Sequence, residues 1–306
     1  MSKELEARVT ACEGGLYSVY LQNGRFVSCK PRGRFRHERM KILVGDSVTL
    51  SEDEKGNRCI DAVSERHGTL MRPPIANVDR LFVTVSAARP EPLTLNIDKL
   101  TCIAVHNGIK PVIVITKCEL SRENAEFLRQ VYTRAGFDCF LTSSAENEGI
   151  DALRAYLTNA PSCCLDVFAG ASGVGKSTLL NTLFPSLSLK TQEISAKIAR
   201  GRHTTRSVVL FPVEILTGSG RGYIADTPGF SLLDFESFDF FSKEDLPYTF
   251  PEFEPFLGTC RYTKCSHTKE EGCRIIAETS GGAVPPSRHE SYKALYGQLK
   301  NKHFYD

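Results

Sequence analysis

Residues 170–177 have the types and spacing of a loop that binds phosphate. They read Gly-Ala-Ser-Gly-Val-Gly-Lys-Ser and fit the pattern GxxxxGK[ST]. The glycines let the backbone present N–H groups to phosphate oxygens, the Lys176 ammonium reaches the outer phosphates, and the Ser177 hydroxyl can hold Mg²⁺. An apolar strand before the loop and a helix after it, whose positive end favours anions, disfavour a plain glycine-rich turn. The nucleotide contacts predicted here are Gly170, Ala171, Ser172, Gly173, Val174, Gly175, Lys176, Ser177 and Thr178.

A second segment, Asp226-Thr227-Pro228-Gly229, fits the DxxG pattern on the magnesium side of a GTPase site. Asp226 ends an apolar run and can hold Mg²⁺ through water, and the Gly229 N–H can contact a γ-phosphate. A threonine in the basic segment 200–206 would complete the magnesium shell in the triphosphate state and leave it on hydrolysis. We assign that role to Thr205, with Thr204 as the alternative, and a solvated basic loop is the competing interpretation. The expected catalytic residues are Lys176, Ser177, Thr205 and Gly229.

Base recognition is assigned to Thr116-Lys117-Cys118-Glu119, which resembles the NKxD segment that reads guanine. In that segment the carboxylate accepts from the guanine N1–H and 2-amino groups, the lysine stem covers the ring, and the asparagine supports the loop. Glu119 keeps the carboxylate on a longer stem, and Thr116 lacks the amide. Ser143-Ser144-Ala145 follows the next apolar strand, and Ser144 and Ala145 are expected to supply the backbone N–H that meets guanine O6.

The order of these segments indicates a circular permutation. Ordinary GTPases run from phosphate loop to base segments, whereas here the base segments precede the phosphate loop. Such a rearrangement moves the chain termini without removing a nucleotide contact. Phe230 stands after Gly229 where a glutamine would position the attacking water, so we expect slow intrinsic hydrolysis that a partner accelerates. Gly173 stands where potassium-activated GTPases have asparagine, and potassium dependence is not predicted.

Three cysteines and a histidine lie within one short polar segment near the C-terminus. Cys260, Cys265, His267 and Cys273 form a closed set of four ligands typical of structural Zn²⁺. Because no ligand position is left for water, the predicted role is folding a small lobe and not catalysis. The alternative is a chance cluster of reduced cysteines.

The elements that position these residues change character along the chain. Short strands punctuated by glycine turns are predicted at 7–10, 16–20, 25–29, 47–50 and 59–63. Five such strands favour an oligonucleotide-binding type of β-barrel, although their number also permits another small barrel.

Apolar strands alternating with helices follow, which is typical of a parallel sheet covered on both faces. Strands are predicted at 80–85, 111–115, 138–141, 164–169, 208–211 and 223–225, the last two joined by a turn at 218–220. Helices are predicted at 97–106, 123–135, 150–157, 177–183 and 288–300. The predicted fold is therefore multi-domain: an OB-like N-terminal β-barrel, a central α/β permuted P-loop GTPase domain and a C-terminal zinc-binding helical lobe. The predicted bounds are 1–68, 69–240 and 241–306.

Positive charge is local and not global. The 306-residue chain has a formal net charge of only +2, yet residues 30–41 hold six Lys and Arg against one Glu, in a loop between two barrel strands. Such loops flank the nucleic-acid face of this barrel class, and a solvated loop is the alternative. The zinc lobe adds Arg261, Lys264 and Lys269, and the last helix adds Arg288, Lys293 and Lys300.

Composition points to a cytoplasmic protein. The charged N-terminal segment has no apolar stretch of a secretory signal, and no run approaches the length of a membrane span. Eleven cysteines without such a signal indicate reduced thiols.

Taken together, these motifs resemble the RsgA (YjeQ) family of bacterial permuted GTPases that depend on the small ribosomal subunit. The resemblance covers the barrel, the permuted domain, the CxxxxCxHxxxxxC lobe, the Gly201-Arg202-His203-Thr204-Thr205 stretch and the tail from Ser287 to Tyr292. It implies a monomeric cytoplasmic Mg²⁺-dependent GTP hydrolase that binds the 30S subunit and 16S rRNA, without DNA or membrane partners. It also implies a role in late 30S maturation, with ribosome-stimulated hydrolysis of GTP to GDP and phosphate.

Two other functions remain open at this stage. One is an RNA-binding assembly scaffold that binds GTP with little turnover, which Phe230 and the altered base segment motivate. The other is an ATP-using phosphate-loop enzyme with a small-molecule substrate, which is disfavoured because no acid–base pair accompanies the loop.

Overall fold

A computed structural model describes residues 5–37, 40–52, 57–161, 163–187, 208–226 and 242–300. The predicted switch threonines Thr204 and Thr205 lie outside the described residues, as does the stretch from Thr227 to Phe230 with Gly229. Among the described residues, no helix combines the length and the apolar character that crossing a bilayer requires.

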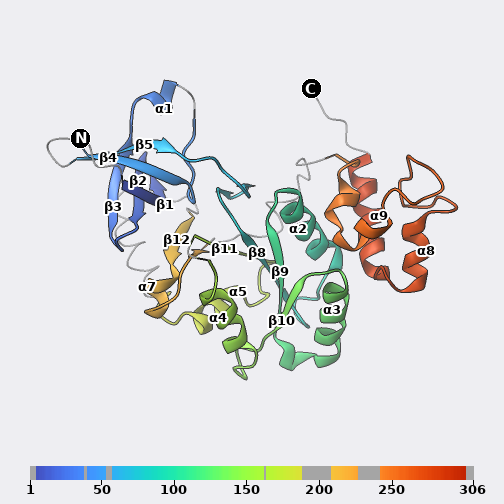
Figure 1. Ribbon diagram of the computed structural model, residues 1–306. Helices are drawn as coiled ribbons and strands as arrows, with labels where there is room; N and C mark the ends of the chain where they lie inside the picture. Colours follow the sequence, from blue (N-terminus) through green and yellow to red (C-terminus); the bar gives the residue numbers. More distant parts are fainter. Residues whose placement is uncertain are drawn as a thin grey trace. The chain divides into compact units, whose positions relative to one another are not determined.

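The N-terminal strands close into a barrel in the order β1-β2-β3-β5-β4, which confirms the prediction (Figure 1). β3 and β5 pair in parallel, and the pairs β1–β2, β1–β4, β2–β3 and β4–β5 are antiparallel. Alternate side chains such as Val9, Val19, Leu50 and Ile60 are fully buried and fill the barrel, as the period of a strand requires. The bounds are β1 (Leu5–Glu13), β2 (Leu16–Leu21), β3 (Phe26–Pro31), a short α1 (Arg34–His37), β4 (Ser47–Glu52) and β5 (Arg58–Val63).

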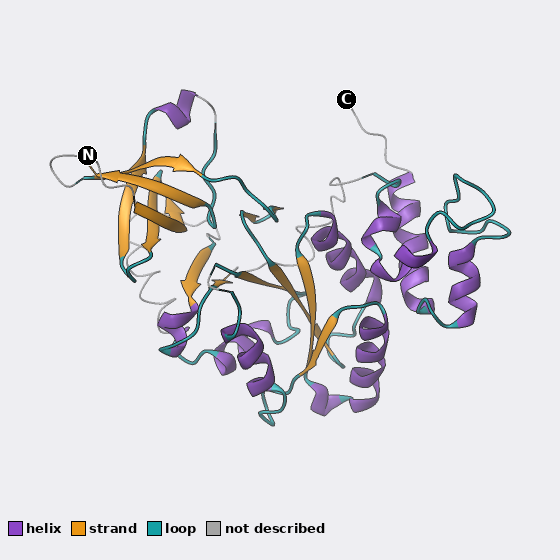
Figure 2. Ribbon diagram, viewed as in Figure 1, coloured by secondary structure: helices purple, strands orange, loops and turns teal. Residues whose placement is uncertain are grey.

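The middle of the chain forms a six-stranded sheet with the order β10-β9-β8-β11-β13-β12 (Figure 2). β10 pairs with β9 and β11 with β13 in parallel, whereas β12 is antiparallel to β13. All residues of β8 and β11 are buried, as continuous apolar strands of a covered sheet should be. The strands are β8 (Arg80–Ser86), β9 (Lys110–Thr116), β10 (Asp138–Leu141), β11 (Leu165–Ala169), β12 (Val209–Pro212) and β13 (Tyr223–Asp226). The helices that follow strands are α2 (Thr94–His106), α3 (Arg122–Arg134), α4 (Ile150–Thr158) and α5 (Lys176–Leu183).

The connection between β12 and β13 differs from the expected simple turn. A helix, α7 (Val213–Thr217), precedes the turn, and Gly218 ends that helix at φ 76°. A left-handed glycine is a frequent helix stop, so Gly218 ends a helix here, whereas the sequence predicts only a turn at 218–220. The structure also contains a short hairpin that the sequence does not predict, formed by two strands of two residues each, β6 (Leu70–Met71) and β7 (Pro74–Ile75).

The chain divides into two compact units. The first comprises Met1–Arg80, Arg154–Phe168 and Leu180–Phe230, and the second comprises Leu81–Leu153, Ala169–Leu179 and Ser231–Asp306. Within the first unit, buried Arg8 donates to the Gly45 carbonyl oxygen at 2.7 Å and to the Cys163 carbonyl oxygen at 3.0 Å. These bonds attach barrel strand β1 to the segment that leads into β11.

The C-terminal segment is helical, with η3 (Leu246–Thr249), η4 (Pro251–Phe256), α8 (Arg274–Gly281) and α9 (Pro286–Lys300). Arg288 of α9 is fully buried, which corrects its assignment to a basic surface. Its guanidinium bonds both carboxylate oxygens of Glu252, at 2.6 and 3.1 Å, and Asp98 of α2 at 2.7 Å. The Tyr132 hydroxyl of α3 also donates to Asp98, at 2.8 Å. This buried ion network fastens α9 to α2 and α3 within the second unit.

Replacing the central cation should destabilise the second unit strongly. In Arg288→Met, Asp98 and Glu252 lose the guanidinium and remain buried, and breaking such a pair costs about 3–5 kcal/mol of unfolding free energy. The matched control is Arg129→Met, because Arg129 of α3 pairs with Glu126 at the surface and such a pair contributes about 1 kcal/mol or less. Urea unfolding of both variants measures the difference, and equal small losses would contradict this interpretation.

Candidate nucleotide-binding site and metal centre

The phosphate loop connects β11 to α5 and depends on its glycines. A Cβ at Gly170 would lie 2.4 Å from the Thr84 carbonyl oxygen, so no larger residue fits there. Gly173 and Gly175 have φ of 80° and 99°, a backbone region that favours glycine. Lys176 begins α5, and the Leu179 N–H closes its first turn on the Gly175 carbonyl oxygen at 2.8 Å. The loop therefore leads directly into a helix N-terminus, as anion binding requires.

The predicted base segment contacts the phosphate loop directly. The Lys117 ammonium donates to the Gly173 and Arg89 carbonyl oxygens, each at 2.7 Å. The Thr116 hydroxyl lies 3.1 Å from the Val85 carbonyl oxygen and also within hydrogen-bonding distance of the Val174 carbonyl oxygen. Thr116 thus supports the loop, although it lacks the amide of the usual asparagine. Two motifs that are far apart in the sequence build one site.

Glu119 has an oxygen that suits a guanine base. Its Oε2 atom is buried and has no hydrogen-bond partner in the part of the chain that the structure describes. A buried acceptor without a donor costs free energy, so a ligand that supplies N–H groups is favoured there. The N1–H and 2-amino groups of guanine are donors of this kind, and the residues present fit a guanine nucleotide.

The segment with Ser144 and Ala145 forms a tight turn. Ser143 and Glu148 exchange two backbone hydrogen bonds of 3.0 Å and so close the turn at its base. Gly149 follows at φ 70°, and a Cβ there would lie 1.9 Å from the Leu141 carbonyl oxygen. The Cys118 N–H bonds the Thr142 carbonyl oxygen at 3.2 Å, which places the turn beside the base segment.

The oxygen donors predicted for magnesium are partly described. The Ser177 residue is exposed in the first turn of α5, and Asp226 is the last residue of β13. Hydroxyl, carboxylate and phosphate oxygens are hard ligands that suit Mg²⁺, so the donor types fit. Thr205 and Gly229 lie outside the described residues.

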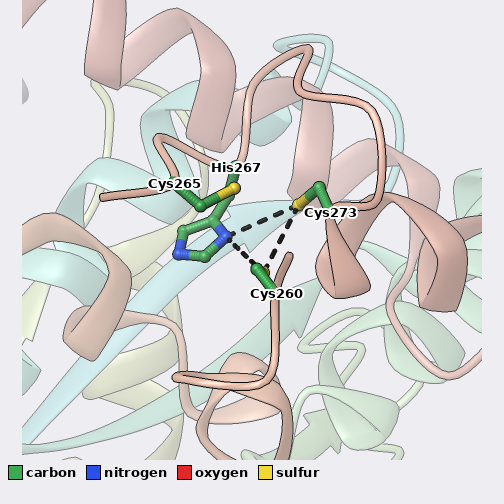
Figure 3. A group of neighbouring side chains, drawn as sticks. All are labelled: Cys260, Cys265, His267 and Cys273. Atoms are coloured by element: carbon green, nitrogen blue, oxygen red, sulfur yellow. Dashed lines mark hydrogen bonds between the residues drawn. The ribbon is translucent and has the colours of Figure 1, made fainter. Parts of the chain in front are cut away.

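The four predicted metal ligands point toward one another (Figure 3). Their ligand atoms all lie within 4.8 Å of each other. His267 Nδ1 is 3.5 Å from the sulfurs of Cys260 and Cys273, which are 3.9 Å apart. Ligand atoms on a tetrahedral zinc lie about 3.5–3.8 Å apart, given the usual Zn–S and Zn–N lengths. The cluster can therefore hold a metal ion and fits zinc.

Helix α9 supports this cluster through two side chains that bond backbone carbonyl oxygens of the cluster segment. His289 Nε2 lies 2.8 Å from the His267 carbonyl oxygen, and the Tyr292 hydroxyl donates to the Ser266 carbonyl oxygen at 2.8 Å. Burial lowers the pKa of His267, which favours the neutral imidazole that binds metals. Burial raises the pKa of the Cys265 thiol to about 12, so its deprotonation needs a bound cation.

Comparison with known proteins identifies the family. The RsgA GTPase family model matches residues 63–236, which is more than half of the chain, and the RsgA N-terminal domain model matches residues 6–60. The chain belongs to the RsgA GTPase family. RsgA family membership means GTP hydrolysis, and the nucleotide is GTP or GDP.

Curated relatives and solved structures of the RsgA family are similar along almost the whole chain. Proteins named small ribosomal subunit biogenesis GTPase RsgA from Halalkalibacterium halodurans and Moorella thermoacetica are 39% and 38% identical. The first covers 94% of this chain and 95% of the relative, and the second 94% of both. YjeQ from Thermotoga maritima is 30% identical with a TM-score of 0.80, covering 98% of this chain and 100% of YjeQ. YloQ, described as a circularly permuted GTPase, is 29% identical with a TM-score of 0.77, and the match covers 99% of this chain and 98% of YloQ.

Four contacts of this site have no signal in the sequence motifs. The Arg89 carbonyl oxygen and the Val85 carbonyl oxygen hold Lys117 and Thr116 through backbone atoms, which no side-chain motif signals. Arg122 bonds two glutamates of the turn 143–148. The only sequence feature that points to Arg122 is its positive charge at the first position of the helix that follows the base segment.

We expect the purified protein to hold one zinc ion, measured by atomic absorption. Cys273→Ser should lose the ion and lower the melting temperature, whereas Cys163→Ser, which changes an exposed cysteine outside the cluster, should keep it. Zinc affinity should rise with pH because the thiols lose protons on binding. Stoichiometric zinc in Cys273→Ser, or none in the wild type, would contradict the assignment.

Proposed function

We propose that the protein hydrolyses GTP to GDP and phosphate while bound to the small ribosomal subunit and acts in late 30S maturation. The observation that carries the proposal is the attachment of Thr116 and Lys117 to the phosphate loop beside the unpartnered Glu119 oxygen. This arrangement selects a guanine nucleotide and places its phosphates at the N-terminus of α5. The names of the curated relatives support small-subunit biogenesis as the process.

The roles of the site residues follow from their positions in the motifs. Backbone N–H groups of the loop bind phosphate oxygens, and Lys176 neutralises the charge that develops on the outer phosphates. Ser177, Asp226 and Thr205 would hold Mg²⁺, which supplies charge neutralisation at the phosphates. The Gly229 N–H is proposed to contact the γ-phosphate. Phe230 replaces the glutamine that positions water, so we expect the subunit to complete the site.

RNA contact is proposed at the barrel. A cavity of about 480 Å³ is lined by Lys30, Lys41, Tyr17, Phe35 and the Gly14–Gly15 turn. The ammonium groups of Lys30 and Lys41 suit RNA phosphates, and the half-buried Tyr17 ring suits a stacked base, whereas Phe35 is buried in the barrel core. Arg32 is partly neutralised, because its Nε lies 3.0 Å from Asp61, so Lys30 and Lys41 are the stronger candidates.

The remaining assignments extend this proposal. We propose domains at 1–68, 69–240 and 241–306, with Cys260, Cys265, His267 and Cys273 holding one structural Zn²⁺. The partner is the 30S subunit with its 16S rRNA, and the protein acts in the cytoplasm as a monomer.

A second candidate is an assembly scaffold that binds RNA and GTP with little turnover. Phe230 favours it, because the chain has no glutamine after Gly229 to orient water. Rapid turnover on 30S subunits distinguishes the two functions.

The test is GTP and ATP hydrolysis with and without 30S subunits. We expect slow GTP-selective turnover that 30S subunits raise by about tenfold or more, and a loss of about a hundredfold in Lys176→Ala. Lys110→Ala is the control, because Lys110 pairs with Asp138 at the surface, outside the proposed machinery. Equal use of ATP would contradict the guanine assignment, and GTP binding without stimulated turnover would favour the scaffold.

A further inference from the structure

Arg122 links the two segments assigned to guanine recognition. It is the first residue of α3, three positions after Glu119, and Ser121 caps this helix by accepting from the Asn124 N–H at 3.4 Å. The Arg122 guanidinium donates from Nη1 to Glu148 Oε1 at 2.6 Å and from Nη2 to Glu146 Oε2 at 2.9 Å. Nη2 also bonds Glu148 Oε2. One planar group thus bridges two carboxylates of the neighbouring turn.

Both carboxylates belong to the turn that carries Ser144 and Ala145. Glu148 pairs with Ser143 through the backbone, and the Glu146 N–H donates to the Ser143 hydroxyl at 3.0 Å. The backbone hydrogen bond from the Cys118 N–H to the Thr142 carbonyl oxygen joins the base segment to the residue just before this turn. Arg122 adds bonds to the two acidic side chains of the turn itself.

We propose that Arg122 is a positioning residue that holds the turn 143–148 so that its backbone N–H groups meet guanine O6. The proposal rests on the proposed function, namely binding of a guanine nucleotide at this site. Arg122 touches no nucleotide atom and acts only through the turn. Its loss therefore weakens binding of the base and leaves the chemistry at the phosphates unchanged.

Another ion pair on the same helix shows what distinguishes Arg122. Arg129 Nε bonds Glu126 at 2.7 Å, but this partner is three residues away on α3 itself. The partners of Arg122 are 24 and 26 residues away, in a different loop. An i,i+3 pair stabilises only its own helix, whereas the Arg122 bonds fix the start of α3 against the turn 143–148.

The size of the effect follows from exposure. The side chains of Arg122, Glu146 and Glu148 are 51%, 54% and 44% exposed, so solvent and salt screen the attraction. A bidentate network between exposed groups changes an equilibrium by about two- to fivefold. That change should shrink as salt is added.

The experiment measures the dissociation constants of GDP, IDP and ADP for the full chain, together with kcat and KM for GTP. Arg122→Gln should bind GDP and IDP about two- to fivefold more weakly, by the same factor, because both bases carry O6. ADP binding should not change, since adenine has an amino group in place of O6. KM should rise with kcat unchanged, and the ratio to wild type should approach one at 1 M salt, where the Debye length is about 3 Å.

Three further variants make the test specific to the bridge. Arg129→Gln removes an equivalent charge from the same helix and should bind GDP like the wild type. Arg122→Lys keeps the charge but not the planar fork, so it should recover part of the affinity. In a double-mutant cycle, adding Glu148→Gln to Arg122→Gln should cost less than Glu148→Gln alone, because the shared bond is already lost.

Unchanged GDP affinity in Arg122→Gln overturns the proposal, as does an equal loss in Arg129→Gln or an equal loss for ADP. If the wild type itself shows no preference for GDP over ADP, the proposed function fails, and this result is separate from any property of Arg122.

Discussion

The nucleotide site depends on the bonds that join Lys117 and Thr116 to the phosphate loop. The Lys117 ammonium satisfies the carbonyl oxygens of Gly173 and Arg89, and the Thr116 hydroxyl reaches the Val174 carbonyl oxygen. The Gly173 and Val174 carbonyl oxygens belong to the phosphate loop, and they accept their hydrogen bonds from side chains of another segment. The loop proposed to bind phosphate is therefore supported by the segment proposed to read the base. This contact would couple the two halves of nucleotide recognition.

The coupling explains how the chain tolerates its permuted order. Strand ends meet at the edge of a sheet whatever their order along the sequence, and the contacts that matter run between β9 and the loop after β11. The permutation also puts the last strand of the fold, β13, before a C-terminal helical segment. Buried Arg288 joins that segment to α2 through Asp98, which also accepts from Tyr132 of α3, so the metal-binding lobe is attached to the unit that carries the base segment.

Much of this fold could be predicted because its signals are local. The five barrel strands, the six sheet strands and the helices after β8, β9 and β11 follow from periodicity and glycine punctuation, with ends shifted by a few residues. Cys260, Cys265, His267 and Cys273 were recognisable from spacing alone. The burial of Arg288 could not be predicted, because its partners Asp98 and Glu252 are distant in the sequence and an arginine without a known partner is expected at the surface. Arg122 is exposed, but its partners Glu146 and Glu148 lie 24 and 26 residues away, so its role was also invisible in the local sequence. Helix α7 was not predicted because Gly218 fits both a helix end and a turn.

The central claim is that Glu119 reads the base beside a phosphate loop held by Lys117. The most direct measurement is competition between GDP and XDP for the wild type and for Glu119→Gln. Xanthine carries an oxygen where guanine has its 2-amino group, so the Gln amide can donate to xanthine whereas the carboxylate accepts from guanine. We predict that the wild type prefers GDP and that the variant prefers XDP. An unchanged preference in the variant would show that another group reads the base and would contradict the account.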